Sequence, residues 1–287
     1  MAAKNHTLCT VWKKGFIMSF SRLLFALAVV TGSPAWSHEF WIEPEQYQVE
    51  SDAPIIANLR NGENFKGIAL AWFDKRFTRF DLIEGETARP VTGRMGDRPA
   101  LQTGPAADGL LIVVHETTPT TLTYRKWEKF EAFVAHKDFK DAIATHKARG
   151  WPTDKFREEY TRHAKALIAV GDGAGSDRPI GMETEFIALT NPYADDFDGT
   201  MQVHLTYQDA PRADAQVEVF ARAPDGSVEV SLYRTDGSGQ ARIPVTAGYE
   251  YLFDAVVLRP SPLAGTEADA PVWRTLWAAL TFAVPAQ

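Results

Sequence analysis

Short apolar runs separated by turn residues constrain the fold of this chain most. Such runs occupy residues 55–59, 68–73 and 110–114, with Asn61-Gly62 and Asp108-Gly109 among the turns that punctuate them. The pattern returns from Thr184 onward, where residues 201–207 alternate strictly between apolar and polar side chains. Alternation over short runs bounded by turns is typical of half-buried β-strands. The sequence therefore predicts a mainly β protein built from two antiparallel β-sandwich domains.

The pattern changes between these two regions. Trp127, Phe130, Phe133 and Val134 recur at helical spacing in a stretch that ends at Gly150. We expect a second helix after it, with one apolar face made by Phe156, Tyr160, Ala164, Leu167 and Ile168. The predicted order is an N-terminal sandwich over 38–126, a helical insert over 127–170, a glycine- and acid-rich linker over 171–183 and a C-terminal sandwich over 184–287.

The first 37 residues have the pattern of a signal peptide. Arg22 precedes an apolar run from Leu23 to Val30, and Ala35-Trp36-Ser37 is a small-x-small cleavage signature. That run is too short to span a bilayer, and no later run resembles a membrane span. We expect cleavage after Ser37 and a periplasmic protein that starts at His38, with Met18 as an alternative start of translation.

Composition narrows the chemistry of the mature chain. Cys9 is the one cysteine and lies in the leader, so the mature chain has no disulfide, no thiolate ligand and no cysteine nucleophile. The leader also removes Lys4, Lys13, Lys14 and Arg22, which leaves 26 − 37 = −11 as the formal charge. Such an acidic chain is not expected to bind nucleic acid.

His38 is the residue that most suggests a function. As a mature N-terminus it would offer a metal ion both an α-amine and an imidazole, and nitrogen ligands of this kind suit nickel, cobalt and copper. His115, which ends the run 110–114 and precedes Glu116, is the first choice for a second ligand. The alternatives are a solvated chain end for His38 and a strand-end histidine bonded to backbone for His115.

The other candidates have simpler interpretations. His204 lies on the polar face of an alternating segment, His136 and His146 are not spaced as a helical pair, and Glu159 and His163 are spaced to form a surface hydrogen bond on a helix. We expect the many tryptophans to be buried rather than to form a sugar-binding platform. Zincin, Gly-x-Ser-x-Gly and dinucleotide patterns are absent from the sequence, so no enzymatic activity is predicted.

Several segments carry a resemblance to a known family. They are His38-Glu39-Phe40-Trp41-Ile42-Glu43-Pro44, residues 160–167 with Val170-Gly171-Asp172, Asn191-Pro192-Tyr193, residues 235–241 and the ending 273–282. In this order they resemble the secreted bacterial proteins filed as domain of unknown function 4198. The Thr-Asp-Gly-x-Gly turn at Thr235 also resembles that of immunoglobulin-like or prealbumin-like modules.

The resemblance implies an exported, β-rich protein, and some family members are associated with nickel or cobalt uptake as periplasmic metal-binding accessories. Our leading hypothesis is therefore a non-enzymatic metal-binding protein that uses His38 and has a metal transporter or another envelope protein as partner. The main alternative is an envelope interaction or glycan-binding module without metal. A copper oxygenase with an arrangement similar to a histidine brace is a third hypothesis.

Overall fold

The longest strand of the protein, β10 (Phe156–Val170), lies inside its largest sheet. The computed structural model describes residues 1, 2 and 38–286. β10 runs parallel to β18 (Trp273–Ala283) on one side and antiparallel to β8 (Gly109–Thr117) and β9 (Thr120–Tyr124) on the other. All residues from Thr161 to Val170 are buried, because other parts of the chain cover both faces of this strand.

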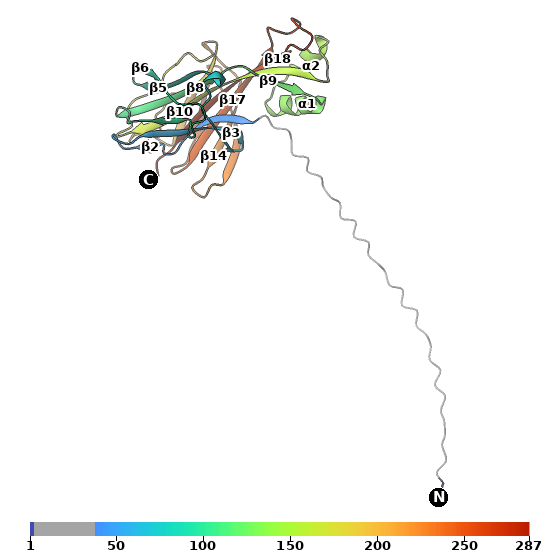
Figure 1. The fold of residues 1–287 in the computed structure, drawn as a ribbon. Helices are drawn as coiled ribbons and strands as arrows, with labels where there is room; N and C mark the ends of the chain where they lie inside the picture. The colour runs from blue at the N-terminus through green and yellow to red at the C-terminus, as the bar shows by residue number, and fades with distance from the viewer. Residues whose placement is uncertain (3–37, 287) are drawn as a thin grey trace. The chain divides into compact units, whose positions relative to one another are not determined.

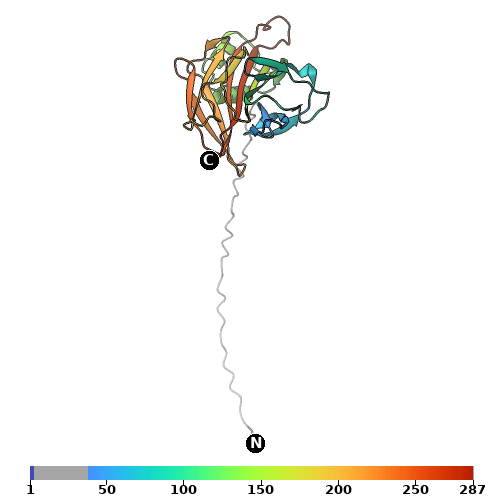
Figure 2. The same ribbon diagram turned by 90° about the vertical axis from the view of Figure 1, so that its left-hand side faces the viewer.

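This sheet, which we call sheet B, has ten strands in the described part of the chain (Figures 1 and 2). Its main path follows the order β15-β14-β17-β18-β10-β8-β5-β6, while β2 and β9 pair with β10 outside that path. The bounds of the strands not yet given are β2 Gln48–Val49, β5 Phe77–Glu84, β6 Thr87–Pro90, β14 Gln216–Arg222, β15 Val228–Arg234 and β17 Glu250–Pro260.

Two smaller antiparallel sheets cover the two faces of sheet B. Sheet A consists of β1 (Glu39–Pro44), β3 (Ile55–Glu63), β4 (Lys66–Leu70) and β7 (Leu101–Thr103). Sheet C consists of β11 (Thr184–Ala188), β12 (Thr200–Tyr207), β13 (Ala210–Pro211) and β16 (Gln240–Pro244). A single 3-10 turn, η1 (Asp74–Arg76), leads into β5.

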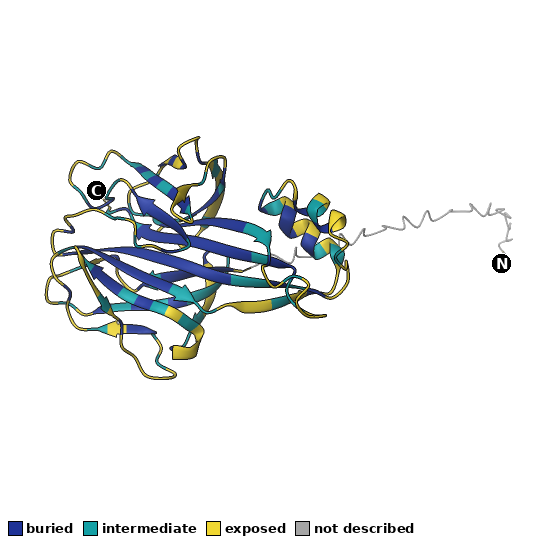
Figure 3. Cartoon of the chain, turned by 90° about the horizontal axis from the view of Figure 1, so that it is seen from above, coloured by how far each residue is buried: buried dark blue, intermediate teal, exposed yellow. Residues whose placement is uncertain are grey.

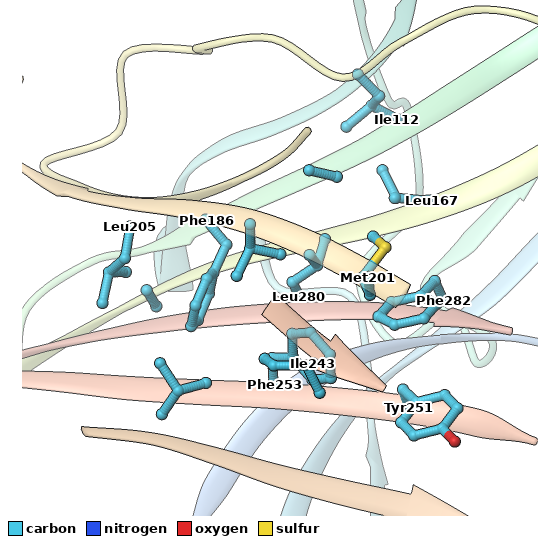
Figure 4. Packing of buried hydrophobic residues seen from close by; sticks show 14 of the residues in the cluster. Ile112, Leu167, Phe186, Met201, Leu205, Ile243, Tyr251, Phe253, Leu280 and Phe282 are labelled. Carbon is cyan, nitrogen blue, oxygen red and sulfur yellow. The ribbon is translucent and has the colours of Figure 1, made fainter. Parts of the chain in front are cut away.

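Successive side chains of a strand point to opposite faces of sheet B, so each face has its own hydrophobic core. In β10, Leu167 and Ala169 pack toward sheet C, whereas Ala164, Ala166 and Ile168 pack toward sheet A. The first core also contains Phe186, Met201, Phe253 and Phe282 (Figure 4). The second is built around Trp41, which is fully buried. The central strands are accordingly buried along most of their length, while loops and the outer helix surfaces are exposed (Figure 3).

Two helices, α1 (Trp127–His136) and α2 (Ala142–Ala148), lie at one end of sheet B (Figure 1). Their apolar residues form a third core with Tyr124, Phe156, Trp273 and Trp277. The helix predicted over residues 156–168 is wrong, because these residues form β10. The apolar residues at positions 156, 160, 164, 167 and 168 happen to match helical spacing, but the strand is buried on both faces from Thr161 onward, so it lacks the alternation that marks a half-buried strand.

The predicted mainly β class, with antiparallel sheets packed face to face, is confirmed. Strands from both predicted sandwich domains share sheet B, since β8 belongs to the first region and β18 to the second. The division into two domains stays a prediction. The predicted leader and its cleavage lie outside the described residues, apart from His38 itself. No helix in the described part of the chain is long and apolar enough to cross a membrane.

Candidate ligand pocket

A pocket of about 480 Å³ opens between sheet A and the face of sheet B that it covers. Residues from β1, β3, β4, β8, β9 and β10 reach it, together with the segment that leads through η1 into β5. Its apolar lining comes from Phe40, Leu59, Leu70, Ala71, Phe73 and Phe77, and its polar lining from Asn61, Arg76, Arg98, His115, Thr117, Thr120, Tyr160 and Arg162.

Three of these lining residues are arginines, and none of the described lining residues is a carboxylate. Arg76 and Arg98 are exposed, and neither forms an ion pair with another described residue. Arginine side chains stay protonated in proteins and present several donors in a planar fork that matches carboxylate and phosphate groups. The pocket therefore has a positive lining, although the whole chain is acidic.

Arg162 is the most constrained of the three. It is 7% exposed, and burial lowers the pKa of its guanidinium while the carboxylates of Asp254 and Glu39 oppose that shift. Its Nη2 donates to the backbone oxygen of His38 at 2.7 Å, and the guanidinium carbon lies 4.0 Å from the ring centre of Trp277. Its Nη1 is buried and has no hydrogen-bond partner among the described residues. A buried donor without a partner is unfavourable, and this one belongs to a residue that lines the pocket.

Aromatic rings surround His115, the second buried polar residue of the lining. Its ring centre lies 5.2 Å from that of Phe40, 5.3 Å from Phe77 and 4.9 Å from Phe80. The residue is 2% exposed, and neither ring nitrogen has a hydrogen-bond partner within residues 38–286. Burial lowers the pKa of His115 to about 3. The imidazole is thus neutral at physiological pH and offers one donor and one acceptor.

His38 lies next to this pocket, since its backbone oxygen binds Arg162. Its side chain is 57% exposed, and Nε2 lies 3.4 Å from Oε1 of Glu63. Within the described residues no ring contact joins it to His115, whose neighbours are phenylalanines. The described residues also contain no group of three or more histidine, cysteine or acidic side chains able to hold a metal ion. The assignment of His38 and His115 as metal ligands stays a prediction.

A buried charged cluster supports the Trp277 ring on which Arg162 stacks. Nζ of Lys137 lies 4.7 Å from the centre of that ring, 2.5 Å from Oε2 of Glu218 and 2.9 Å from Oδ2 of Asp254. Glu39 is also buried nearby, and burial, reinforced by the charge of Asp254, raises its pKa to about 8. Lys137 therefore offsets two buried carboxylates and helps to fix Trp277, and through it Arg162, at the pocket wall.

The sequence analysis did not single out the three arginines. The available signal was an arginine within the mainly apolar run 161–170, but this segment was expected to be a helix and Arg162 was given no role in a site. Glu159 and His163 do not form the expected pair, because they lie on a strand, and Nε2 of His163 lies 4.0 Å from Oε2 of Glu116. The expected burial of tryptophans is confirmed for Trp41, Trp72, Trp273 and Trp277.

The remaining described histidines do not line the pocket. His146 is fully buried, accepts a hydrogen bond from Nε1 of Trp273 and contacts the backbone oxygen of Pro152 at 3.0 Å. Nε2 of His136 lies 2.7 Å from Oε1 of Glu218, within the charged cluster. His204 is half-buried on β12, away from the pocket.

The fold and pocket define a mainly β protein with a small-molecule-sized cavity between two of its sheets. Residues 35–259 match the family described as a domain of unknown function, DUF4198, and the chain belongs to this family. No curated protein matches the chain.

Two solved structures are similar at low identity. The D0-D1 domain of intimin shares 14% identity with a TM-score of 0.20, over 84% of this chain and 97% of that one. A tetra-tandem repeat from the extending region of a large adhesion protein shares 11% identity with a TM-score of 0.20, over 85% of this chain and 49% of that one. These scores are too low to support an argument about function.

Proposed function

We propose that this protein is a periplasmic binding protein whose pocket between sheets A and B holds a small organic anion. The observation that carries the proposal is Arg162, a buried cation at the wall of a pocket lined by two further arginines, whose Nη1 has no hydrogen-bond partner within residues 38–286. A cation of this kind gains most from an anionic partner that enters a site already formed.

The size and lining of the pocket support the same class of ligand. Its volume of about 480 Å³ falls in the range of roughly 300–1,000 Å³ that small-molecule sites occupy. Phe40, Phe73 and Phe77 provide apolar lining in the same pocket as the arginines. A carboxylate or phosphate attached to an apolar body would pair its charge with the arginines and bury its body against the rings.

Calorimetric titration of the purified protein tests the proposal. We expect binding in a panel of 2-naphthoate, benzoate, decanoate and phenyl phosphate, and weaker binding of 2-naphthalenemethanol, the uncharged analogue of 2-naphthoate. Replacing Arg76 and Arg98 together by glutamine should weaken anion binding by about tenfold or more. Arg242→Gln is the matched control, because Arg242 bonds Gln202 in sheet C. Absence of binding by every anion, or equal binding of the alcohol, would overturn the proposal.

A second candidate function is the binding of nickel, cobalt or copper at a mature N-terminus. The position of Glu63 favours it, because a carboxylate beside Nε2 of His38 leaves Nδ1 available to chelate a metal together with the new α-amine. Mass spectrometry of exported protein would establish whether the chain starts at His38. Metal titration of that material should show binding that is lost in His38→Ala and in a chain extended by one alanine before His38. Binding by the extended chain would exclude a role for the α-amine.

A further inference from the structure

We infer that the anion taken by this pocket carries a hydroxyl group on its apolar body and that His115 recognises that hydroxyl. The inference rests on the proposed anion-binding function and adds to it the chemical class of the ligand. Its basis is the presence of two different unpartnered buried polar groups in one pocket, the Arg162 guanidinium and the His115 imidazole.

The two groups make different demands on a ligand. Arg162 is a cation with an unpartnered N–H donor among the described residues, so it favours an anionic group. His115 is neutral inside a cage of three phenylalanine rings, so a second negative charge beside it would be placed in an apolar environment. A hydroxyl both donates and accepts, and it can therefore satisfy a neutral imidazole in either tautomer.

The strand register places the backbone positions of Arg162 and His115 close together. The backbone N–H of Arg162 donates to Oγ1 of Thr117 at 2.9 Å, so Arg162 lies beside the end of β8. His115 precedes Thr117 by two positions on the same strand, and both residues line the pocket. Two positions along a strand correspond to roughly 7 Å, which a body of one or two fused rings can span. Phe40 and Phe77 contact His115 and also line the pocket, so such a body would lie against their rings.

Paired ligands that differ by a hydroxyl test the inference by calorimetry. The probes are 2-naphthoate, 3-hydroxy-2-naphthoate and 6-hydroxy-2-naphthoate. We expect at least one hydroxylated compound to bind the full chain about tenfold more tightly than 2-naphthoate, which is the difference that one buried hydrogen bond supplies. His115→Phe should remove this preference, so that 2-naphthoate and the hydroxylated compounds bind with equal affinity. His204→Phe, which removes a histidine of sheet C, is the matched control and should keep the preference.

A second measurement covers the case in which His115→Phe does not fold. The ¹⁵N signals of the His115 ring in the unsubstituted protein should shift with the preferred hydroxynaphthoate and stay unchanged with 2-naphthoate. If 2-naphthoate binds without any hydroxyl preference, or if the preference survives in His115→Phe, the inference fails while the proposed function stands. If no anion of the panel binds, the proposed function fails and this inference with it.

Discussion

At the scale of single residues, the buried imidazole of His115 should lower the stability of the empty protein. Both of its ring nitrogens lack hydrogen-bond partners among the described residues, inside an aromatic cage. Replacement by phenylalanine removes this unsatisfied polar group and keeps a planar ring. We therefore expect His115→Phe to raise the free energy of unfolding by about 1–2 kcal/mol in urea titrations. A less stable variant would show that the imidazole has partners in solution and would weaken the case for a ligand hydroxyl there.

Glu158 should make stability depend on pH. It is 1% exposed and accepts hydrogen bonds from Tyr124 and Thr275, and burial raises its pKa from 4.5 to about 7. The folded protein therefore retains a proton that the unfolded chain releases, and stability from this group falls as pH rises from about 4.5 to about 7. Relative to the unsubstituted protein, Glu158→Gln should gain about 3 kcal/mol between pH 4 and pH 8. Parallel stability curves for the two proteins would contradict this assignment.

At the scale of elements, Lys165 attaches the linker over residues 171–183 and sheet C to β10. It is fully buried, with Nζ 2.8 Å from Oδ1 of Asp177 and 2.7 Å from Oε1 of Glu185. Glu185 in turn accepts the backbone N–H groups of residues 180–182. Lys165→Met leaves two buried carboxylates without their cation and should destabilise the protein by about 3–5 kcal/mol. Lys147→Met, on the exposed surface of α2, should change the midpoint of urea unfolding little.

The elements also show what the sequence could and could not predict. Period-two alternation over residues 201–207 predicted β12 of sheet C, which has one buried face, while the apolar runs 55–59, 68–73 and 110–114 predicted β3 and β4 of sheet A and β8 of sheet B. It failed for β10, which is buried on both faces and whose alanine-rich segment 161–170 has no period of two. Because residues 156–168 were predicted as a helix, the pocket that Tyr160 and Arg162 of β10 help to line was not predicted either. Arg162 faces sheet A only because it lies on a strand, and the other lining residues come together through the long-range pairing of β8, β10 and sheet A.

At the scale of the whole molecule, β10 joins the N-terminal and C-terminal halves of the chain, because it pairs with β8 on one side and with β18 on the other. β18 pairs in parallel with β10 along nine consecutive positions, from Glu158–Trp273 to Ala166–Thr281. β1 also connects the two halves, because the backbone oxygen of Ile42 accepts a hydrogen bond from the hydroxyl of Thr281 in β18. The pocket depends on the same connection, since Trp277 of β18 contacts Arg162 of β10, which lines the pocket together with Phe40 of β1.

This topology predicts that the halves expected from the sequence as separate sandwiches unfold together. In urea, far-ultraviolet circular dichroism and tryptophan fluorescence should give coincident single transitions, because loss of either half removes a neighbour of β10. A fragment of residues 184–287 should lack stable β structure by circular dichroism, since β18 would expose the edge that β10 covers. Two separate transitions, or a fragment with a cooperative melt, would instead establish two independent folding units. The pocket would then depend on how those units dock, and anion binding would weaken at urea concentrations that leave both units folded.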